Sequence, residues 1–241
     1  MLPPSFIGDS IAHLSVGGTM MVYGVCIACN TFKEGLGWKR RKELVAFIII
    51  GIVQLAGPLV MLINPDDCYN SVHCFQRNVT HTLAGLFVLF CVACAMFMRK
   101  FAPTVFDFAI PLAGFIPGYF LMTHDHVGET DEVEMVVASL HQASSSFMII
   151  SSVLRIAVEY NKSLELLYSI SFSCIGSLLF VTSPIIVEPA TLNTKFSGSN
   201  LVFLSIALVC VMHMGILGVL VYKRNRVRPV YIELSPINDV I

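Results

Sequence analysis

Histidine is the residue type in this chain best suited to chemistry, because its members recur where long apolar runs begin or end. Residues 124–126 read His-Asp-His between two such runs, and an acidic stretch follows at 129–134. Imidazole nitrogens and carboxylate oxygens are common ligands of zinc, which takes three or four ligands in protein sites. The candidate zinc ligands are His124, His126, His141, His81, His13, Asp9 and His213.

Two spacings support a metal site among these residues. His124 and His126 leave the same predicted helix end and can present two nitrogens to one ion. Asp9 precedes His13 by four residues, so both lie on one helical face and the carboxylate can orient a metal-bound imidazole. The alternatives are a proton relay, or simple packing of amphipathic side chains near the membrane surface.

The elements that must position these residues are membrane-spanning helices. Hydrophobic residues make up 56% of the chain and charged residues 13%, about half the charged share of a soluble domain. Apolar runs of about 20 residues recur, and they lack the alternation of barrel strands. We expect an all-α bundle of seven transmembrane helices, roughly at 8–30, 43–64, 78–98, 102–123, 133–158, 163–185 and 200–222. This single domain, 1–222, precedes a tail at 223–241.

Lysine and arginine predict the orientation of the bundle. Of the 15 Lys and Arg residues, only Arg77 and Lys195 fall on one side of the predicted spans. Because cytoplasmic loops carry the excess of positive charge, the N-terminus is expected outside and the C-terminus in the cytoplasm. The histidines then gather in the outer half of the bilayer, in either the plasma membrane or the endomembrane system.

Cysteines form two groups. Cys68 and Cys74 lie in the predicted outer loop, where an oxidising environment favours a disulfide; two unpaired thiols are the alternative. The C-x-x-C pairs at 26–29 and 91–94 have the spacing of half zinc sites. Both pairs lie within apolar helices, however, where cysteine is usually a small packing residue.

One carboxylate and one guanidinium are expected to meet within the bundle. Asp107 lies toward the cytoplasmic end of the fourth span, where an unpaired carboxylate would be protonated or paired. Arg155 reaches a similar depth on the fifth span. We therefore expect an Asp107–Arg155 ion pair.

Membrane lipids are the partners that the composition predicts. The net charge of −1 and the lack of a basic patch with interleaved aromatics argue against nucleic acid. The basic start of the tail can lie on anionic lipid headgroups. The segment YIEL at 231–234 has the pattern of a sorting signal that trafficking adaptors read.

Short landmarks follow one another along nearly the whole chain. They are IAHLSVGG at 11–18, HTLAGLF at 81–87, FLMTHDHVG at 120–128, LELLYS at 164–169 and VMHMG at 211–215. In this order they resemble the transmembrane protein 45 family, a group of seven-helix membrane proteins. The resemblance implies that the histidines are a shared family feature, and it implies no reaction, because the family's activity is not established.

Two departures from the family pattern bear on the site. The family tends to open its fifth span with a His-x-His pair, whereas Ser139 stands two residues before His141 here. The loop from His126 to His141 is also several residues longer than in the family. A site that needs the missing imidazole would be altered or absent.

Three functions are compatible with these residues. The first is an intramembrane zinc site, either structural or activating a water for hydrolysis of a lipid. The second is transport of protons or metal ions along the histidines toward His213 and Asp107. The third is a non-catalytic scaffold or trafficking protein in which the histidines only pack. The sequence favours the zinc site.

Overall fold

The computed structural model describes the backbone of residues 4–31, 40–63, 72–98, 101, 104–124, 132–187 and 197–227. Side chains are described for residues 10–30, 43–55, 79–98, 101, 108–122, 135–185 and 197–223. Every regular element in this part of the chain is a helix, as the apolar runs predict.

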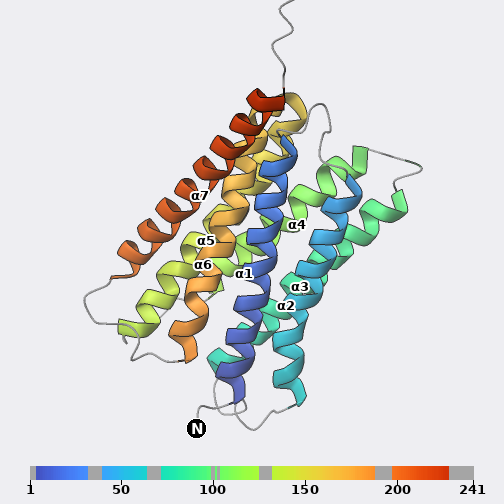
Figure 1. Ribbon diagram of the computed structural model, residues 1–241. Helices are drawn as coiled ribbons and strands as arrows, with labels where there is room; N and C mark the ends of the chain where they lie inside the picture. Colours follow the sequence, from blue (N-terminus) through green and yellow to red (C-terminus); the bar gives the residue numbers. More distant parts are fainter. Residues whose placement is uncertain are drawn as a thin grey trace, which may run out of the picture.

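Seven α-helices alternate in direction along the described chain (Figure 1). They are α1 (Pro4–Thr31), α2 (Arg40–Ile63), α3 (Val72–Met98), α4 (Thr104–His124), α5 (Glu132–Tyr160), α6 (Glu165–Val187) and α7 (Gly198–Val227), with a short 3-10 helix, η2 (Lys162–Leu164), before α6. We call the end of the bundle at which α1, α3 and α5 begin the N-terminal end. α2, α4 and α6 begin at the opposite end.

Five of the described helices are long and apolar enough to cross a membrane, as expected of an integral, multi-pass membrane protein. The five segments are Ser10–Asn30, Val79–Met98, Met135–Tyr160, Lys162–Ile185 and Gly198–Lys223. The apolar segments described in α2 and α4 are shorter, Glu43–Leu55 and Phe108–Met122. Seven spans and an outer N-terminus therefore stay predictions.

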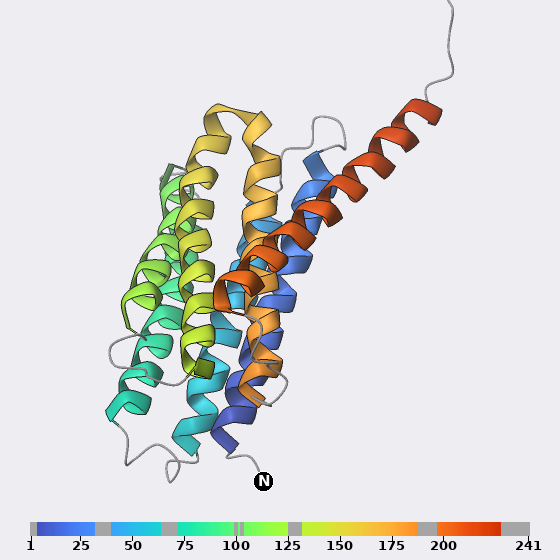
Figure 2. The same ribbon diagram turned by 90° about the vertical axis from the view of Figure 1, so that its left-hand side faces the viewer.

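Six helices close a ring around the main core, and α7 lies against the outside of that ring. Each helix from α1 to α5 packs on the next one, and α6 packs on both α5 and α1. Among the described residues, the largest hydrophobic cluster draws on all six helices and on none of α7. α7 instead crosses α5 and α6 obliquely, and its last turns extend beyond the bundle (Figure 2).

The most extensive contact in the ring joins α1 to α6. Small residues recur at seven-residue spacing on both helices and meet in antiparallel order. The facing pairs are Ser10 with Ser183, Gly17 with Gly176, and Gly24 with Ser169. Small residues let helix backbones approach closely in a membrane, and a seven-residue repeat keeps them on one line as two helices supercoil. We call this contact the α1–α6 seam.

Glycines also set the distance between α4 and α5. Gly114 and Gly118 stand four residues apart on α4, the spacing that favours close helix packing in membranes. A Cβ at Gly118 would lie 3.0 Å from the Cβ of Met148, and one at Gly114 would overlap the hydroxyl of Ser152. The serine-bearing face of α5 is thus held directly against α4.

Gly17→Ala should destabilise the protein, because the seam has no room for a methyl group. Its Cβ would lie 2.8 Å from the carbonyl oxygen of Gly176 and 2.9 Å from the backbone nitrogen of Phe180. Backbone atoms cannot turn aside as a flexible side chain does, so we expect a loss of about 1–3 kcal/mol in the free energy of unfolding. The measurement is thermal unfolding in detergent, followed with a maleimide dye that reacts as the buried thiols of Cys91 and Cys174 become exposed.

Gly18→Ala is the matched control for this prediction. It makes the same change at the next residue of α1, where an added Cβ has nothing within 4 Å. Alanine favours a helix by roughly 0.5–1 kcal/mol over glycine, so this variant should be unchanged or slightly more stable. Equal melting temperatures for the two variants would show that the seam is not closed.

Candidate functional site

The imidazoles of His13 and His141 meet inside the bundle, although 128 residues separate them along the chain. Their Nε2 atoms lie 2.5 Å apart. The ring centroids lie 4.8 Å apart and the ring planes are inclined by 22°. Both side chains are half-buried. Two of the seven candidate ligands, one from α1 and one from α5, thus come together.

The short distance between the two Nε2 atoms limits what can lie between them. Two facing lone pairs would repel each other, so one arrangement is an N–H···N hydrogen bond in which one ring donates and the other accepts. The other is a shared metal ion. Two zinc–nitrogen bonds of about 2.0–2.1 Å at a tetrahedral angle place the nitrogens about 3.3–3.4 Å apart. The rings would then have to separate by about 0.9 Å from their 2.5 Å contact.

α6 positions the two helices that carry this pair. α1 and α5 both pack on α6, on either side of it. One turn from His13, the hydroxyl of Ser10 donates to the carbonyl of Ser183 at 3.1 Å, and the hydroxyl of Ser183 donates to the carbonyl of Ser10 at 2.9 Å. These reciprocal bonds fix the rotation and height of α1 beside the imidazole.

His81 lies at a similar depth on α3, but the structure does not assemble it with the pair into a ligand set. His13, His81 and His141 each lie nine residues after the start of their helices, about 13 Å along the axis. Among the described side chains, no three His, Cys, Asp or Glu residues are grouped so that they could hold a metal ion. For a metal ion the pair would supply two ligands, and further ligands would have to come from side chains beyond that part or from water.

Several predicted residues fall where the structure describes no side chain. His124 is the last residue of α4 and Asp9 lies in α1, and only their backbones are described. His126 lies outside the described residues altogether. Cys68 is also outside them, and Cys74 is described only as a backbone position in α3, so their disulfide stays a prediction.

His213 belongs to a different contact, at the junction of α1, α6 and α7. Its Nδ1 lies 2.9 Å from the carbonyl of Val209 in its own helix, and its Nε2 lies 3.0 Å from the hydroxyl of Ser169. That hydroxyl also donates to the carbonyl of Gly24 at 2.7 Å. Gly24 lies eleven residues after His13, about 16 Å along α1. His213 is thus engaged in hydrogen bonds that dock α7, and it lies too far away to share an ion with the imidazole pair.

A second polar centre lies toward the opposite end of the ring. The carboxylate of Glu43, whose residue is 1% exposed, accepts hydrogen bonds from Nε of Arg155 at 2.6 Å and from its Nη2 at 3.0 Å. The hydroxyl of Tyr168 donates to the same carboxylate at 3.1 Å, and Nη1 of Arg155 donates to Glu159 at 2.6 Å. Only such a bidentate pair with additional hydrogen bonds compensates for removing two charges from water.

The expected pairing of Arg155 with Asp107 stays a prediction. Arg155 pairs with Glu43 of α2 and with Glu159 of its own helix, and the side chain of Asp107 lies outside the described part. Sequence reasoning missed Glu43 because it ends the basic segment KRRKE and looks like part of a solvated loop. The signal that identifies it is its place in the first turn of α2, directly before an apolar run, where the helix dipole favours a carboxylate.

Apolar side chains separate the two polar centres. The ring interior between them contains a cavity of about 10 Å³, lined by residues of all six helices that include Met20, Phe47, Met148 and Phe172. A cavity of this size holds one water at most. Among the residues that line this cavity, Ser151 is the only one with a polar side chain, which weighs against transport along the ring.

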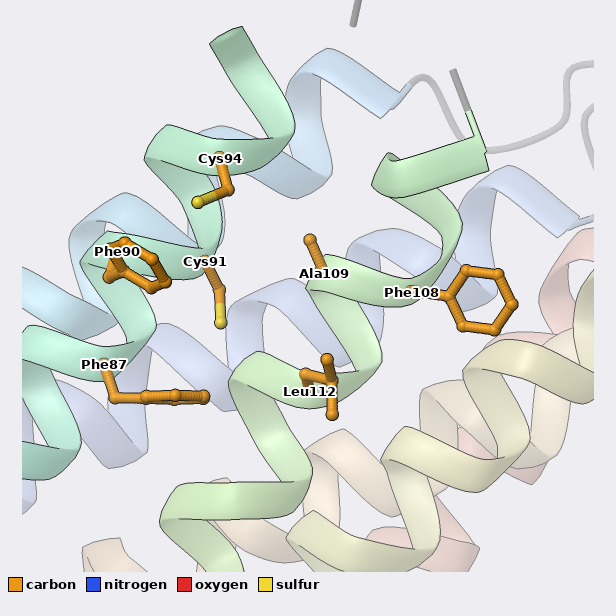
Figure 3. A pocket seen from close by; sticks show the side chains of 7 residues that line it. All are labelled: Phe87, Phe90, Cys91, Cys94, Phe108, Ala109 and Leu112. Carbon is orange, nitrogen blue, oxygen red and sulfur yellow. The ribbon is translucent and has the colours of Figure 1, made fainter. Parts of the chain in front are cut away.

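The two C-x-x-C pairs do not come together as a zinc site. Their four thiols are free, and none belongs to a three-residue ligand group among the described side chains. Cys91 and Cys94 instead line an apolar pocket between α3 and α4 (Figure 3).

Comparison of the chain with protein-family models, with curated proteins and with solved structures gives no match. Its own side chains are therefore the basis for assigning a function.

Glu43→Gln should be strongly destabilising, because it leaves the guanidinium of Arg155 buried against a neutral amide. Breaking one side of a buried ion pair costs about 3 kcal/mol or more. Glu159→Gln is the matched control, since it removes the other carboxylate that Arg155 contacts, a partly exposed one four residues along the same helix. That partly exposed pair, four residues apart on one helix, should contribute only about 0.5 kcal/mol.

The same dye-based melting experiment measures both losses. A fall in melting temperature several times larger for Glu43→Gln than for Glu159→Gln is expected. Equal falls would mean that the Glu43–Arg155 pair is solvated and does not hold α2 against α5.

Proposed function

We propose that this multi-pass membrane protein binds a transition-metal ion, zinc by the chemistry of its ligands, at His13 and His141. The observation that carries the proposal is that two Nε2 atoms from different helices face each other inside the bundle. Ionisable side chains within a membrane are costly and by default indicate a functional site. Two imidazoles directed at the same point, with the same ring nitrogen, are the start of a zinc coordination sphere.

His124, His126 and Asp9, whose side chains lie outside the described part, are the proposed source of the remaining ligands. α4 ends and α1 begins at the N-terminal end of the bundle, the end nearest to the imidazole pair. A zinc site with protein ligands from α1, α4 and α5 would hold those helices together at this end. With one position left to water, it would also have the ligand set of a hydrolytic centre. The resemblance to the transmembrane protein 45 family is in keeping with this proposal, but no step depends on it.

A shared proton is the second candidate for the same pair. The 2.5 Å distance favours it, because two ligands of one zinc ion would lie farther apart than this. The pair would then act as a proton-binding site at one end of the bundle. The apolar interior beneath it argues against a proton path to Glu43.

The metal content of the purified protein distinguishes the two candidates. Mass spectrometry of detergent-purified protein should find close to one zinc ion per chain, and the double variant His13→Gln/His141→Gln should lose it. Cobalt added to protein stripped of metal should give the visible absorption of a tetrahedral Co²⁺ site in the native chain only.

His213→Gln is the matched control, because it removes a buried imidazole that lies outside the pair. It should retain the metal and the cobalt spectrum, while size-exclusion profiles and helical content verify that both variants are folded. A native protein that takes up neither zinc nor cobalt would rule out the metal site and leave the shared proton. Equal metal contents in native protein and in the double variant would place the metal elsewhere.

A further inference from the structure

An apolar groove runs along the outer side of the bundle between α3 and α4. It has a volume of about 310 Å³ and is lined by Phe87, Phe90, Cys91 and Cys94 of α3 and by Phe108, Ala109 and Leu112 of α4. In Figure 3, Phe87 and Cys91 point toward Leu112 and Ala109 across the gap between the two helices. The volume falls within the range of small-molecule sites, which is roughly 300–1,000 Å³.

Two small lining residues form the floor of the groove. Cys91 and Ala109 are 5% and 6% exposed, whereas Phe90 and Phe108 at its sides are 64% and 62% exposed. The α3 residues follow the spacing of one helical face, at 87, 90, 91 and 94. The C-x-x-C spacing therefore has a packing explanation, since small side chains at 91 and 94 leave space that larger ones would fill.

We propose that this groove holds one acyl chain of a bilayer lipid. α3 is one of the five helices able to cross a membrane, and the groove lies within its apolar segment Val79–Met98. It is continuous with the lipid-facing surface of the same helix, where Leu83, Leu86 and Phe97 are also exposed. The lining residues offer no charged group, so neither a headgroup nor a polar ligand has a partner there.

The dimensions of the groove fit an acyl chain that runs parallel to the helices. From Phe87 to Cys94 the lining extends seven residues, about 10 Å along α3. One leaflet contributes about 15 Å of the ~30 Å hydrocarbon thickness, so the groove can hold most of a chain within one leaflet. Cys94 lies four residues before the end of α3, which places the groove in the half of the membrane opposite to the imidazole pair.

Dispersion contacts, and not the hydrophobic effect, retain the acyl chain in the groove. Lipid tails are as apolar as the groove, so moving one from the bilayer into the groove removes no surface from water. A chain held between two helices instead gains contacts on several sides that the moving tails of the surrounding lipid do not provide. We therefore expect slower exchange and higher occupancy than on a flat lipid-facing surface.

Photolabelling from a phospholipid with a diazirine in its acyl chain tests this site. In nanodiscs, the α3 and α4 peptides that line the groove should carry a several-fold excess of adduct over the α7 peptide with Leu204, Leu208 and Val211. Those α7 residues are 56%, 65% and 70% exposed, so they report contact with ordinary surrounding lipid. Equal labelling of the two surfaces would overturn the proposal.

Cys94→Phe is the variant that fills the groove, and Cys26→Phe is its matched control. Both replace a free thiol on a membrane-spanning helix by the same aromatic ring, but Cys26 is exposed on α1, outside the groove. The groove adducts should fall to the α7 level in Cys94→Phe and stay unchanged in Cys26→Phe. Unchanged adducts in both would overturn the proposal.

The intact mass of the native protein tests two other occupants of the groove. An acyl thioester on Cys94 would overturn the proposal in favour of a covalently attached acyl chain. A dimer cross-linked through Cys94 would overturn it in favour of a second copy of the protein.

Discussion

The α1–α6 seam is the contact on which the rest of the bundle depends. Gly17 and Gly176 bring the two backbones so close that an added methyl group would meet peptide atoms. Hydrophobicity cannot drive this approach inside a membrane, because lipid tails are as apolar as the side chains. Close van der Waals contact and hydrogen bonds must hold the seam. The reciprocal Ser10–Ser183 bonds at one end and the Ser169–Gly24 bond at the other supply the latter.

The two helices beside the seam, α5 and α7, take their positions from it. His13 lies three residues after Ser10 on α1, and α6 carries α5 on its other flank, so closing the seam brings His13 within reach of His141. At the other end, the Ser169 hydroxyl that bonds α1 is the same one that contacts His213 of α7. This imidazole thereby adds hydrogen bonds to the packing of α7 against the ring. The seam thus links a candidate chemical site to a structural one.

Depth in the membrane could be predicted from the sequence, whereas the direction in which each side chain points could not. The apolar runs predicted the helices because the membrane requires about 20 apolar residues per span. They also placed His13 and His141 at one depth, and the two rings do meet. The same reasoning assigned Arg155 to Asp107, a residue of similar depth. That pairing stays a prediction, because the side chain of Asp107 is not described. Glu43 is a partner of Arg155 that depth did not predict, because α2 directs its first turn into the ring. Neighbour relations between helices depend on glycine contacts at the seam and between α4 and α5, which hydropathy does not reveal.

Two rows of residues at seven-residue spacing, one on α5 and one on α1, determine where polar and apolar side chains lie inside the ring. On α5 the row is His141, Met148 and Arg155, and on α1 it begins with His13 and Met20. Fourteen residues separate His141 from Arg155, about 21 Å along the helix, against ~30 Å of hydrocarbon. A helix placed symmetrically would bring each polar group to within about 5 Å of a membrane surface, with methionine at the centre. Charge is thus kept near the two surfaces, where desolvation costs least, and the middle is apolar. This arrangement explains how one chain can hold an imidazole pair and a buried ion pair in the same interior without connecting them.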